Sequence, residues 1–259
     1  MLEKFENALS KQGIPRAKLF KHLSKEGHPD FILELLKAQG SPLYEHQGKF
    51  IYKTAIQPIS HGKFCIMDIE TNGSKPSKGA TIIELGAVIY QDGKIIDTFE
   101  SFAQCNTIPM SIQELTGISL EDTLNAPTLK EVMFKFREFL ADCVFVAHDV
   151  KFDYNFTSAM MQRVGLEPLQ NRKLCTFALA QRSFKAQRYG LKYLNANLKL
   201  YSDADHHRAL SDAITALELM KLSMKTLPKK VTSVEDLILF SKEAPRLQKQ
   251  NTKSKEPSK

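Results

Sequence analysis

Short apolar runs and segments of helical spacing alternate along the middle of the chain. β-Branched and aromatic side chains gather in three runs and predict consecutive strands over residues 64–69, 81–90 and 94–102. The dipeptide Asp92-Gly93, between the last two runs, is typical of a hairpin turn. A further strand and two helices are predicted over residues 144–147, 152–164 and 209–222.

The first 60 residues have a pattern of their own. Helical spacing in three short segments predicts helices over residues 2–12, 16–24 and 30–39, with Gly13-Ile14-Pro15 and Gly40-Ser41-Pro42 as breaks. Residues 43–52 alternate around Gln47-Gly48 and predict a hairpin, which completes the layout of a winged helix. This unit is either a module that contacts nucleic acid or a polymerase partner, or a small helical cap packed on the rest. The cap is favoured, because no dense stripe of Arg and Lys marks a recognition helix.

Two acidic residues end the first predicted strand, in the segment FCIMDIETNG. Asp68 and Glu70 are two residues apart and therefore point to the same face, at the strand end where ligands bind in open α/β sheets. Such a pair is costly to bury unless a cation lies between the two carboxylates. The alternative is that both residues begin a solvated turn after a core strand.

Two later segments supply matching residues. Asp153 lies near the start of a predicted helix, where the helix dipole favours a carboxylate, and it is alternatively a simple helix-start acid. Asp212 lies in the second turn of the last predicted helix, five residues after His207. Histidine as a residue type titrates near neutrality and suits the removal of a proton from water. The alternative is that His206 and His207 are only exposed loop residues. Together the four carboxylates and the histidine predict a two-cation site of the kind that hydrolyses phosphodiesters.

Residues 64–227 resemble the DEDDh 3′ to 5′ exonucleases, the group that contains the proofreading epsilon subunit of bacterial DNA polymerase III. The motifs DIETNG, HDVKFD and HRALSDA occur in the family's order, and IIELGAV and LTGI are two further matches. A histidine five residues before the last aspartate defines the subgroup. The departures are Asn72, where many relatives have Thr, and Asp149, where Asn is common. Neither removes a candidate metal ligand.

The resemblance implies an α/β, ribonuclease-H-like exonuclease fold over residues 61–227: a mixed five-stranded sheet flanked by helices, next to the small helical or winged-helix-like unit at 1–60. It also implies two divalent cations, Mg²⁺ or Mn²⁺, one held by Asp68, Glu70 and Asp212 and the other by Asp68 and Asp153. His207 would act as the base that takes the proton of the attacking water, and the rate would rise with pH through the histidine range. The substrate-binding candidates are Ile69, Thr71, Asn72, His148 and Phe152; for Phe152, a place in the core is the alternative.

The expected activity is hydrolysis of DNA from a single-stranded 3′ end to 5′-mononucleotides, in proofreading or repair with a replicative polymerase as partner. Two alternatives stay open: an RNA-trimming exoribonuclease similar to ribonuclease T or oligoribonuclease, and a non-catalytic nucleic-acid-binding module. Filled catalytic positions argue against the second, since a binding module does not need them. The catalytic carboxylates act on phosphate and do not distinguish the two sugars.

The chain becomes basic from residue 228 onward, and its last dozen residues have almost no apolar content, so residues 228–259 are expected to be a largely disordered tail. Residues 234–241 are an apolar island in this tail. Within it DLILF, from position 236 to 240, resembles the peptide by which bacterial replication proteins bind the sliding clamp, although that peptide normally opens with Gln. A short amphipathic helix capped by Ser233 explains the same residues and is favoured.

Composition limits the setting without defining the function. The formal net charge of +7 suits a polyanionic substrate. No apolar run has membrane-spanning length, and residues 1–14 are amphipathic and charged, unlike a secretory signal. The four cysteines are far apart and lack the spacing of metal ligands, so we expect reduced thiols in a cytoplasmic protein.

Overall fold

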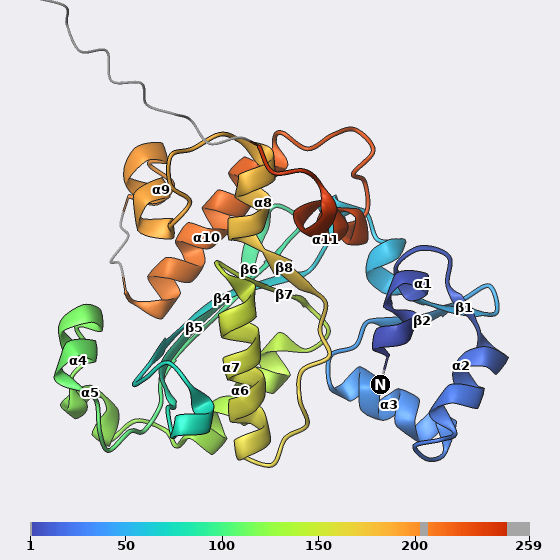
Figure 1. Cartoon of the computed structure of the whole chain (residues 1–259). Coiled ribbons are helices and arrows are strands. Elements are labelled where there is room, and N and C mark those ends of the chain that lie inside the picture. Colours follow the sequence, from blue (N-terminus) through green and yellow to red (C-terminus); the bar gives the residue numbers. More distant parts are fainter. Residues whose placement is uncertain (1, 203–206, 248–259) are drawn as a thin grey trace, which may run out of the picture.

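The computed structural model describes residues 2–202 and 207–247, and a mixed five-stranded sheet lies at its centre (Figure 1). The strands lie in the order β6-β5-β4-β7-β8. Their bounds are β4 Phe64–Thr71, β5 Ile82–Gln91, β6 Lys94–Phe102, β7 Val144–Ala147 and β8 Lys173–Cys175. β4 pairs antiparallel with β5 and parallel with β7. The predicted mixed sheet and its first four strands are therefore confirmed, whereas the short β8 was not predicted.

Helices cover both faces of this sheet. α6 (Leu129–Leu140) and α7 (Val150–Arg163) pack on the face that carries Cys65, Met67 and Ile69 of β4. The opposite face, with Phe64 and Ile66, is covered by α8 (Thr176–Ser183), α10 (Ala209–Met224) and α11 (Val234–Glu243). The remaining helices of this part are α4 Met110–Thr116, α5 Leu120–Leu124 and α9 Leu191–Leu198. Asp68 and Glu70 continue the alternation of Phe64 and Ile66, so they lie on the face that α10 covers.

Residues 2–52 form a group of helices and short strands with a core of their own. α1 (Glu6–Lys11), α2 (Arg16–Leu23) and α3 (Pro29–Ala38), followed by β2 (Leu43–His46) and β3 (Lys49–Tyr52), confirm the three predicted helices and the hairpin. The turn at Gln47-Gly48 has positive φ angles at both residues, as a tight hairpin requires. Short 3₁₀ turns occur at Glu3–Phe5, Lys53–Ala55, Ile59–His61 and Pro76–Lys78.

The predicted break at Gly13-Ile14-Pro15 separates α1 from α2, and it contains an element that was not predicted. Ile14–Pro15 forms a short strand, β1, that pairs antiparallel with β3. The left-handed backbone of Gly13, with φ +74°, ends α1 and turns the chain toward β3. Ile14 then enters the core, where its exposed fraction is 2%. Burial of the isoleucine side chain stabilises this pairing within the break.

A buried polar network joins residues 2–52 to the rest of the protein. The Glu235 carboxylate, on α11, accepts hydrogen bonds from Ser10 Oγ at 3.0 Å, Thr54 Oγ1 at 2.7 Å and Arg172 Nε at 3.1 Å, and also from Arg172 Nη2. Arg172 Nη1 donates in turn to Glu6 at 2.8 Å. The side chains of Glu235 and Arg172 are 1% and 8% exposed. The N-terminal helices thus pack against the sheet and α11 through charged groups that are out of water.

The segment from Asp236 to Phe240 lies in α11 and not in an extended peptide. Ser233 Oγ accepts the N–H of Asp236 at 3.0 Å, and the Asp236 carboxylate accepts the N–H of Ser233 at 2.9 Å, which forms a capping box. Leu237 and Ile238 are fully buried in the core that also holds Leu174 of β8 and Leu179 of α8. The capped helix is therefore confirmed. Clamp binding stays a prediction, restricted to the partly exposed Leu239 and Phe240, because Leu237 and Ile238 are not available to a partner.

The largely disordered tail expected over residues 228–259 is wrong for residues 234–243, which form α11 with a buried apolar side. Residues 248–259 and His206 lie outside the described residues. Within residues 2–202 and 207–247, no helix is both long enough and apolar enough to pass through a membrane.

Candidate active site

The carboxyl half of β4 carries the first two candidate ligands. In the β4–β5 pair, Asp68 lies opposite Gly86 and Glu70 lies opposite Glu84. Burial raises the pKa of Asp68 well above its usual range, and the charges of Asp153, Asp212 and Glu70 raise it further. Burial also raises the pKa of Glu70 to about 8, again with a contribution from Asp212. The four predicted carboxylates therefore lie close enough together to repel one another.

Asp153 reaches this group from α7. Asp149 precedes the helix in a left-handed conformation, with φ +74°, that Asn and Asp adopt more readily than most residues, so the departure at this position keeps the backbone requirement. Asp153 is 3% exposed, and burial raises its pKa to about 8 although nearby backbone N–H groups, including that of Ile69, favour the charged form. Asp153 is therefore both an acid at the start of a helix, as predicted, and a buried residue that faces β4.

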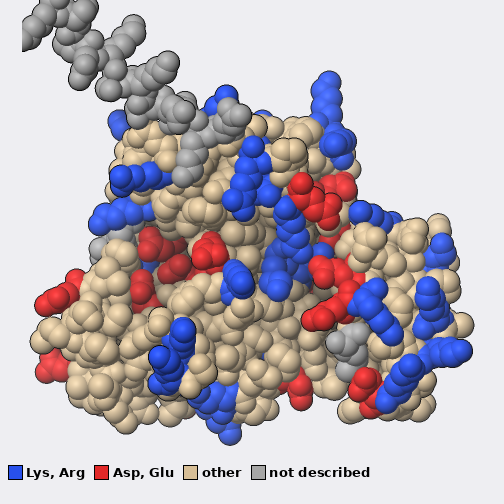
Figure 2. Space-filling model, viewed as in Figure 1, with Lys and Arg blue, Asp and Glu red and all other residues tan. Residues whose placement is uncertain are grey.

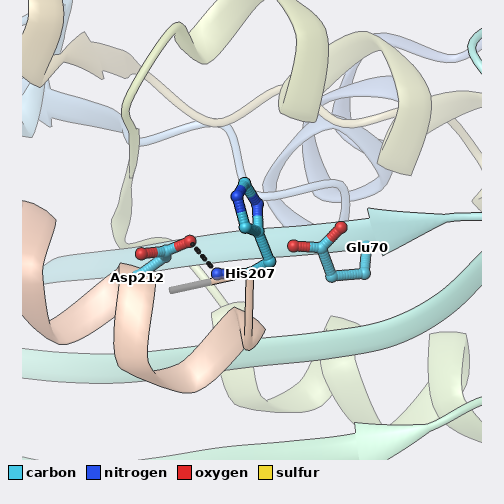
Figure 3. Close-up of side chains that lie close together, drawn as sticks. All are labelled: Glu70, His207 and Asp212. Atoms are coloured by element: carbon cyan, nitrogen blue, oxygen red, sulfur yellow. Dashed lines mark hydrogen bonds between the residues drawn. The ribbon is translucent and has the colours of Figure 1, made fainter. Parts of the chain in front are cut away.

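His207 and Asp212 approach from the beginning of α10. The backbone N–H of His207 donates to Asp212 Oδ2 at 3.1 Å. Figure 3 shows the His207 ring standing between the carboxylates of Asp212 and Glu70. One potential ligand atom from each of these three residues lies within 4.8 Å of the others. The imidazole is therefore near enough to receive a proton from a water held between these carboxylates or to serve as a ligand itself.

The donor set fits divalent cations. Carboxylate oxygens are the ligands that Mg²⁺ and Mn²⁺ prefer. Burial and neighbouring carboxylates raise the pKa values of Asp68, Glu70 and Asp153, so the charged forms of these groups are unfavourable here unless positive charge is supplied. Acidic side chains gather in the middle of one face, where α10, α7 and β4 meet, between lysines and arginines above and below (Figure 2). Cations would relieve this repulsion.

Two polar residues beside the site, Glu84 and Arg208, were not identified from the sequence. Glu84 is 1% exposed, and its carboxylate accepts hydrogen bonds from the guanidinium of Arg208 and the N–H of Ala209. The available signal was the acid itself: an uncompensated glutamate inside an apolar strand needs a buried partner.

The substrate-binding candidates are placed very differently from one another. The Ile69 side chain is 5% exposed and belongs to the core, so only its backbone faces the site. Thr71 Oγ1 donates to the carbonyl of Gly73 at 2.9 Å. The Asn72 amide donates to the Thr107 carbonyl at 3.0 Å and accepts the N–H of Thr81 at 2.7 Å, so it joins neighbouring loops. Their contacts with substrate stay predictions.

His148 and Phe152 differ in the same way. The two ring nitrogens of His148 lie 3.0 Å from Thr176 Oγ1 and 2.8 Å from the carbonyl of Tyr189, and burial lowers the pKa of this histidine. A neutral His148 thus holds neighbouring segments in place. Phe152 is 41% exposed and is not a core residue.

Two pockets are lined by elements that carry candidate site residues. The first has a volume of about 510 Å³ and is lined by the beginning of α7 and by residues 74–76, including Lys75, Lys151 and Phe152. The second, of about 580 Å³, contains His207 and Asp212 together with Lys192 and Tyr193 of α9. Each pocket combines an aromatic ring with a lysine, and the second does so beside two of the candidate site residues.

Comparisons with known proteins agree with this geometry. The family model RNase_T, described as an exonuclease, matches residues 65–220. The chain is 37% identical over 168 residues to the PolC-type DNA polymerase III of Clostridium perfringens, which covers 63% of this chain and 11% of that protein. It is 29% identical over 240 residues to the PolC-type DNA polymerase III of Thermotoga petrophila, covering 87% of this chain and 17% of that protein. The chain thus spans less than a fifth of the length of these relatives.

Among solved structures, E. coli exonuclease I in complex with a dA16 oligonucleotide has a TM-score of 0.59 and 14% identity, covering 70% of this chain and 43% of that one. The likeness is one of fold. It confirms the ribonuclease-H-like exonuclease fold predicted for the five-stranded sheet and its helices.

Proposed function

The chain belongs to the exonuclease family, and from this membership and its carboxylate cluster we propose that it hydrolyses DNA stepwise from a single-stranded 3′ end, releasing 5′-mononucleotides. The observation that carries the proposal is the convergence of Asp68, Glu70, Asp153 and Asp212. Beside burial, the charges of Asp153, Asp212 and Glu70 raise the pKa of Asp68, and those of Asp212 and Asp153 raise the pKa of Glu70. An arrangement so unfavourable without cations is expected where cations are used.

Asp68, Glu70, Asp153 and Asp212 would hold two divalent cations, Mg²⁺ or Mn²⁺. Such cations, when bound, supply a stronger nucleophile from water and neutralise charge on the leaving 3′ oxygen. The chain's own contribution is to orient these carboxylates from β4, α7 and α10 and to accept a proton at His207. The position of the His207 ring between Glu70 and Asp212 supports that role.

The flanking pockets supply surfaces that suit a single strand. Aromatic faces such as Phe152 and Tyr193 stack on bases, and lysines such as Lys75 and Lys192 attract phosphates. DNA is favoured over RNA because the relatives with the stated identities are DNA polymerases. We place the protein accordingly in proofreading or repair beside a replicative polymerase.

The test is degradation of 5′-labelled single-stranded DNA and RNA of matched sequence, with Mg²⁺, with Mn²⁺ and with a chelator. We expect a ladder that shortens from the 3′ end on DNA, requires the cation and is absent for Asp68→Asn. Asp97→Asn, an exposed residue of β6, is the matched control and keeps the activity of the unmodified chain. Faster degradation of RNA would replace the DNA assignment with an RNA-trimming enzyme. If the unmodified chain has no cation-dependent activity on either substrate, the proposal that it is an enzyme is refuted.

His207 is tested separately by its effect on the pH profile. A proton acceptor at this position makes the rate rise with pH as it loses its own proton. His207→Ala is expected to lower the rate at least a hundredfold, since general base catalysis contributes roughly 10²–10⁴-fold, and to flatten that rise. Retention of both the rate and the profile would exclude His207 as the acceptor.

A further inference from the structure

The beginning of α10 is tied to strand β5 by one buried carboxylate. Glu84 Oε1 accepts hydrogen bonds from Arg208 Nε at 3.0 Å and Nη2 at 2.8 Å, and Glu84 Oε2 accepts the N–H of Ala209 at 3.0 Å. Arg208 and Ala209 directly follow His207 in the chain. Both oxygens of Glu84 are therefore used to hold the residues next to the candidate proton acceptor.

Gly86 completes this contact surface two residues further along β5. A Cβ atom at Gly86 would lie 2.0 Å from the backbone nitrogen of Leu210, so the backbone of α10 rests directly on the strand and no larger residue fits. Glu84 and Gly86 point to the same face of β5, as residues two apart do. Together Glu84 and Gly86 determine how closely, and in which orientation, the first turn of α10 packs on β5.

The pairing of β4 with β5 places this contact next to the candidate site. Glu70 lies directly opposite Glu84, and Asp68 lies directly opposite Gly86. The two residues of β5 that support α10 are thus the cross-strand neighbours of the two carboxylates of β4. Any shift of α10 on β5 would move His207 and Asp212 relative to Asp68 and Glu70.

The backbone at His207 makes such support necessary. Its φ angle is +69°, in the left-handed region that residues other than glycine adopt rarely. A conformation of this kind persists only where its surroundings hold it. Here the N–H of His207 is bound by Asp212, and the following residues are bound by Glu84. The guanidinium of Arg208 also lies 5.4 Å from the ring centre of Phe102 on β6.

We propose that Glu84 is a positioning residue for the nuclease chemistry, an inference that rests on the proposed function: by binding Arg208 and the N–H of Ala209 it fixes His207 and Asp212 over Asp68 and Glu70. It acts through these neighbours and not on the substrate. Glu84 is 1% exposed, and each of its oxygens already has a protein donor.

The first variant is Glu84→Gln. An amide has one oxygen where the carboxylate has two, so its NH₂ group would take the place of Oε1 or Oε2 and face either Arg208 or the N–H of Ala209. We expect kcat on labelled single-stranded DNA to fall about tenfold to a hundredfold, in keeping with the cost of small misplacements, while KM changes less than about twofold. Glu100→Gln, an exposed glutamate on the adjacent strand β6, is the matched control. Unfolding midpoints verify that each variant is folded at the assay temperature.

The second variant separates positioning from direct action. If Glu84 works through Arg208, Arg208→Met lowers kcat by a similar factor and the double variant loses little more, because both substitutions remove one coupled unit. Wild-type kcat in Arg208→Met together with inactive Glu84→Gln would overturn the proposal and assign Glu84 a direct role.

A third measurement does not depend on catalysis. The ring C–H resonance of His207 in protein freed of divalent cations, assigned by its absence in His207→Ala, reports the mobility of this segment. Glu84→Gln is expected to broaden or shift it, and Glu100→Gln to leave it in place. An unchanged resonance and unchanged kcat in folded Glu84→Gln overturn the proposal. Inactivity of the unmodified chain would refute the proposed function alone, since the resonance still reports on Glu84.

Discussion

Removal of the negative charge of Glu235 is expected to weaken the whole protein, although this residue is far from the candidate site. Its carboxylate accepts hydrogen bonds from Ser10, Thr54 and Arg172, which belong to three separate segments of the chain. In Glu235→Gln an NH₂ group replaces one of the acceptor oxygens and faces groups that are themselves donors. Arg172, only 8% exposed, is then left with a buried charge that lacks its main counter-ion.

The magnitude follows from the burial of both partners. Breaking a buried ion pair by removing one charge costs about 3–5 kcal/mol of unfolding free energy, because the other charge stays desolvated. A change of 1 kcal/mol shifts the melting temperature of a protein of this size by about 2–4 °C. The melting temperature of Glu235→Gln is therefore expected to fall by roughly 10 °C. Glu6→Gln removes the partly exposed end of the same network and is expected to cost no more than about 1 kcal/mol.

Thermal unfolding of the full chain, followed by circular dichroism, provides the measurement. Glu243→Gln, an exposed glutamate on the same helix, is the control for loss of one negative charge. A melting temperature of Glu235→Gln within about 2 °C of this control would refute the reasoning, since by the same scaling it corresponds to 1 kcal/mol or less. A double variant, Glu235→Leu with Arg172→Met, should recover much of the loss, because no unpaired charge remains buried.

Three further outcomes are expected. The pKa of Glu70 is raised from 4.5 to about 8, so its contribution to stability is complete at acid pH and is lost as pH rises through about 8. The melting temperature measured with a chelator should therefore fall as pH rises through this window. A melting temperature that does not change with pH would contradict this prediction. Phe152→Ala should raise KM for single-stranded DNA about tenfold with little change in stability, because stacking of a base on the exposed ring contributes about 1–3 kcal/mol. An unchanged KM would show that Phe152 does not contact the substrate. Leu237→Ala should lower the unfolding free energy by about 2–5 kcal/mol, as for a fully buried leucine, and a change below 1 kcal/mol would contradict its core position.

The sequence predicts the parts of the fold that depend on the local spacing of apolar and polar residues. Alternation along β4 predicts that Asp68 and Glu70 share a face, and the spacing of five between His207 and Asp212 places both at the start of one helix. Contacts between distant segments carry no such signal. Glu84 and Arg208 are 124 residues apart. Ile14 lies in the predicted break between two helices, but its pairing with β3 and its burial were not predicted.

The same limit applies to the attachment of the N-terminal helices. Helical spacing and a turn at Gln47-Gly48 predict their presence, but not the face by which they pack. That face depends on Glu235 and Arg172, which are 63 residues apart and which composition alone would place on the surface. A single sequence does not show which charged residues are buried, or with which residues far away in the chain they pair.

Glu84 has a further consequence for the charge of the site. Arg208 is close enough to lower the pKa of Glu70, and an arginine beside several carboxylates would ordinarily bridge them. Its Nε and Nη2 donate to Glu84 Oε1, so this ion pair draws the guanidinium toward β5. In Glu84→Gln, Arg208 loses this anionic partner and is expected to turn toward Glu70 and Asp212, where its charge would compete with the proposed cations. Titration calorimetry should then show weaker binding of Mn²⁺ than in the Glu100→Gln control. Equal affinity in the two variants would mean that Arg208 keeps its place without Glu84, and that the charge of the cluster is protected by other contacts.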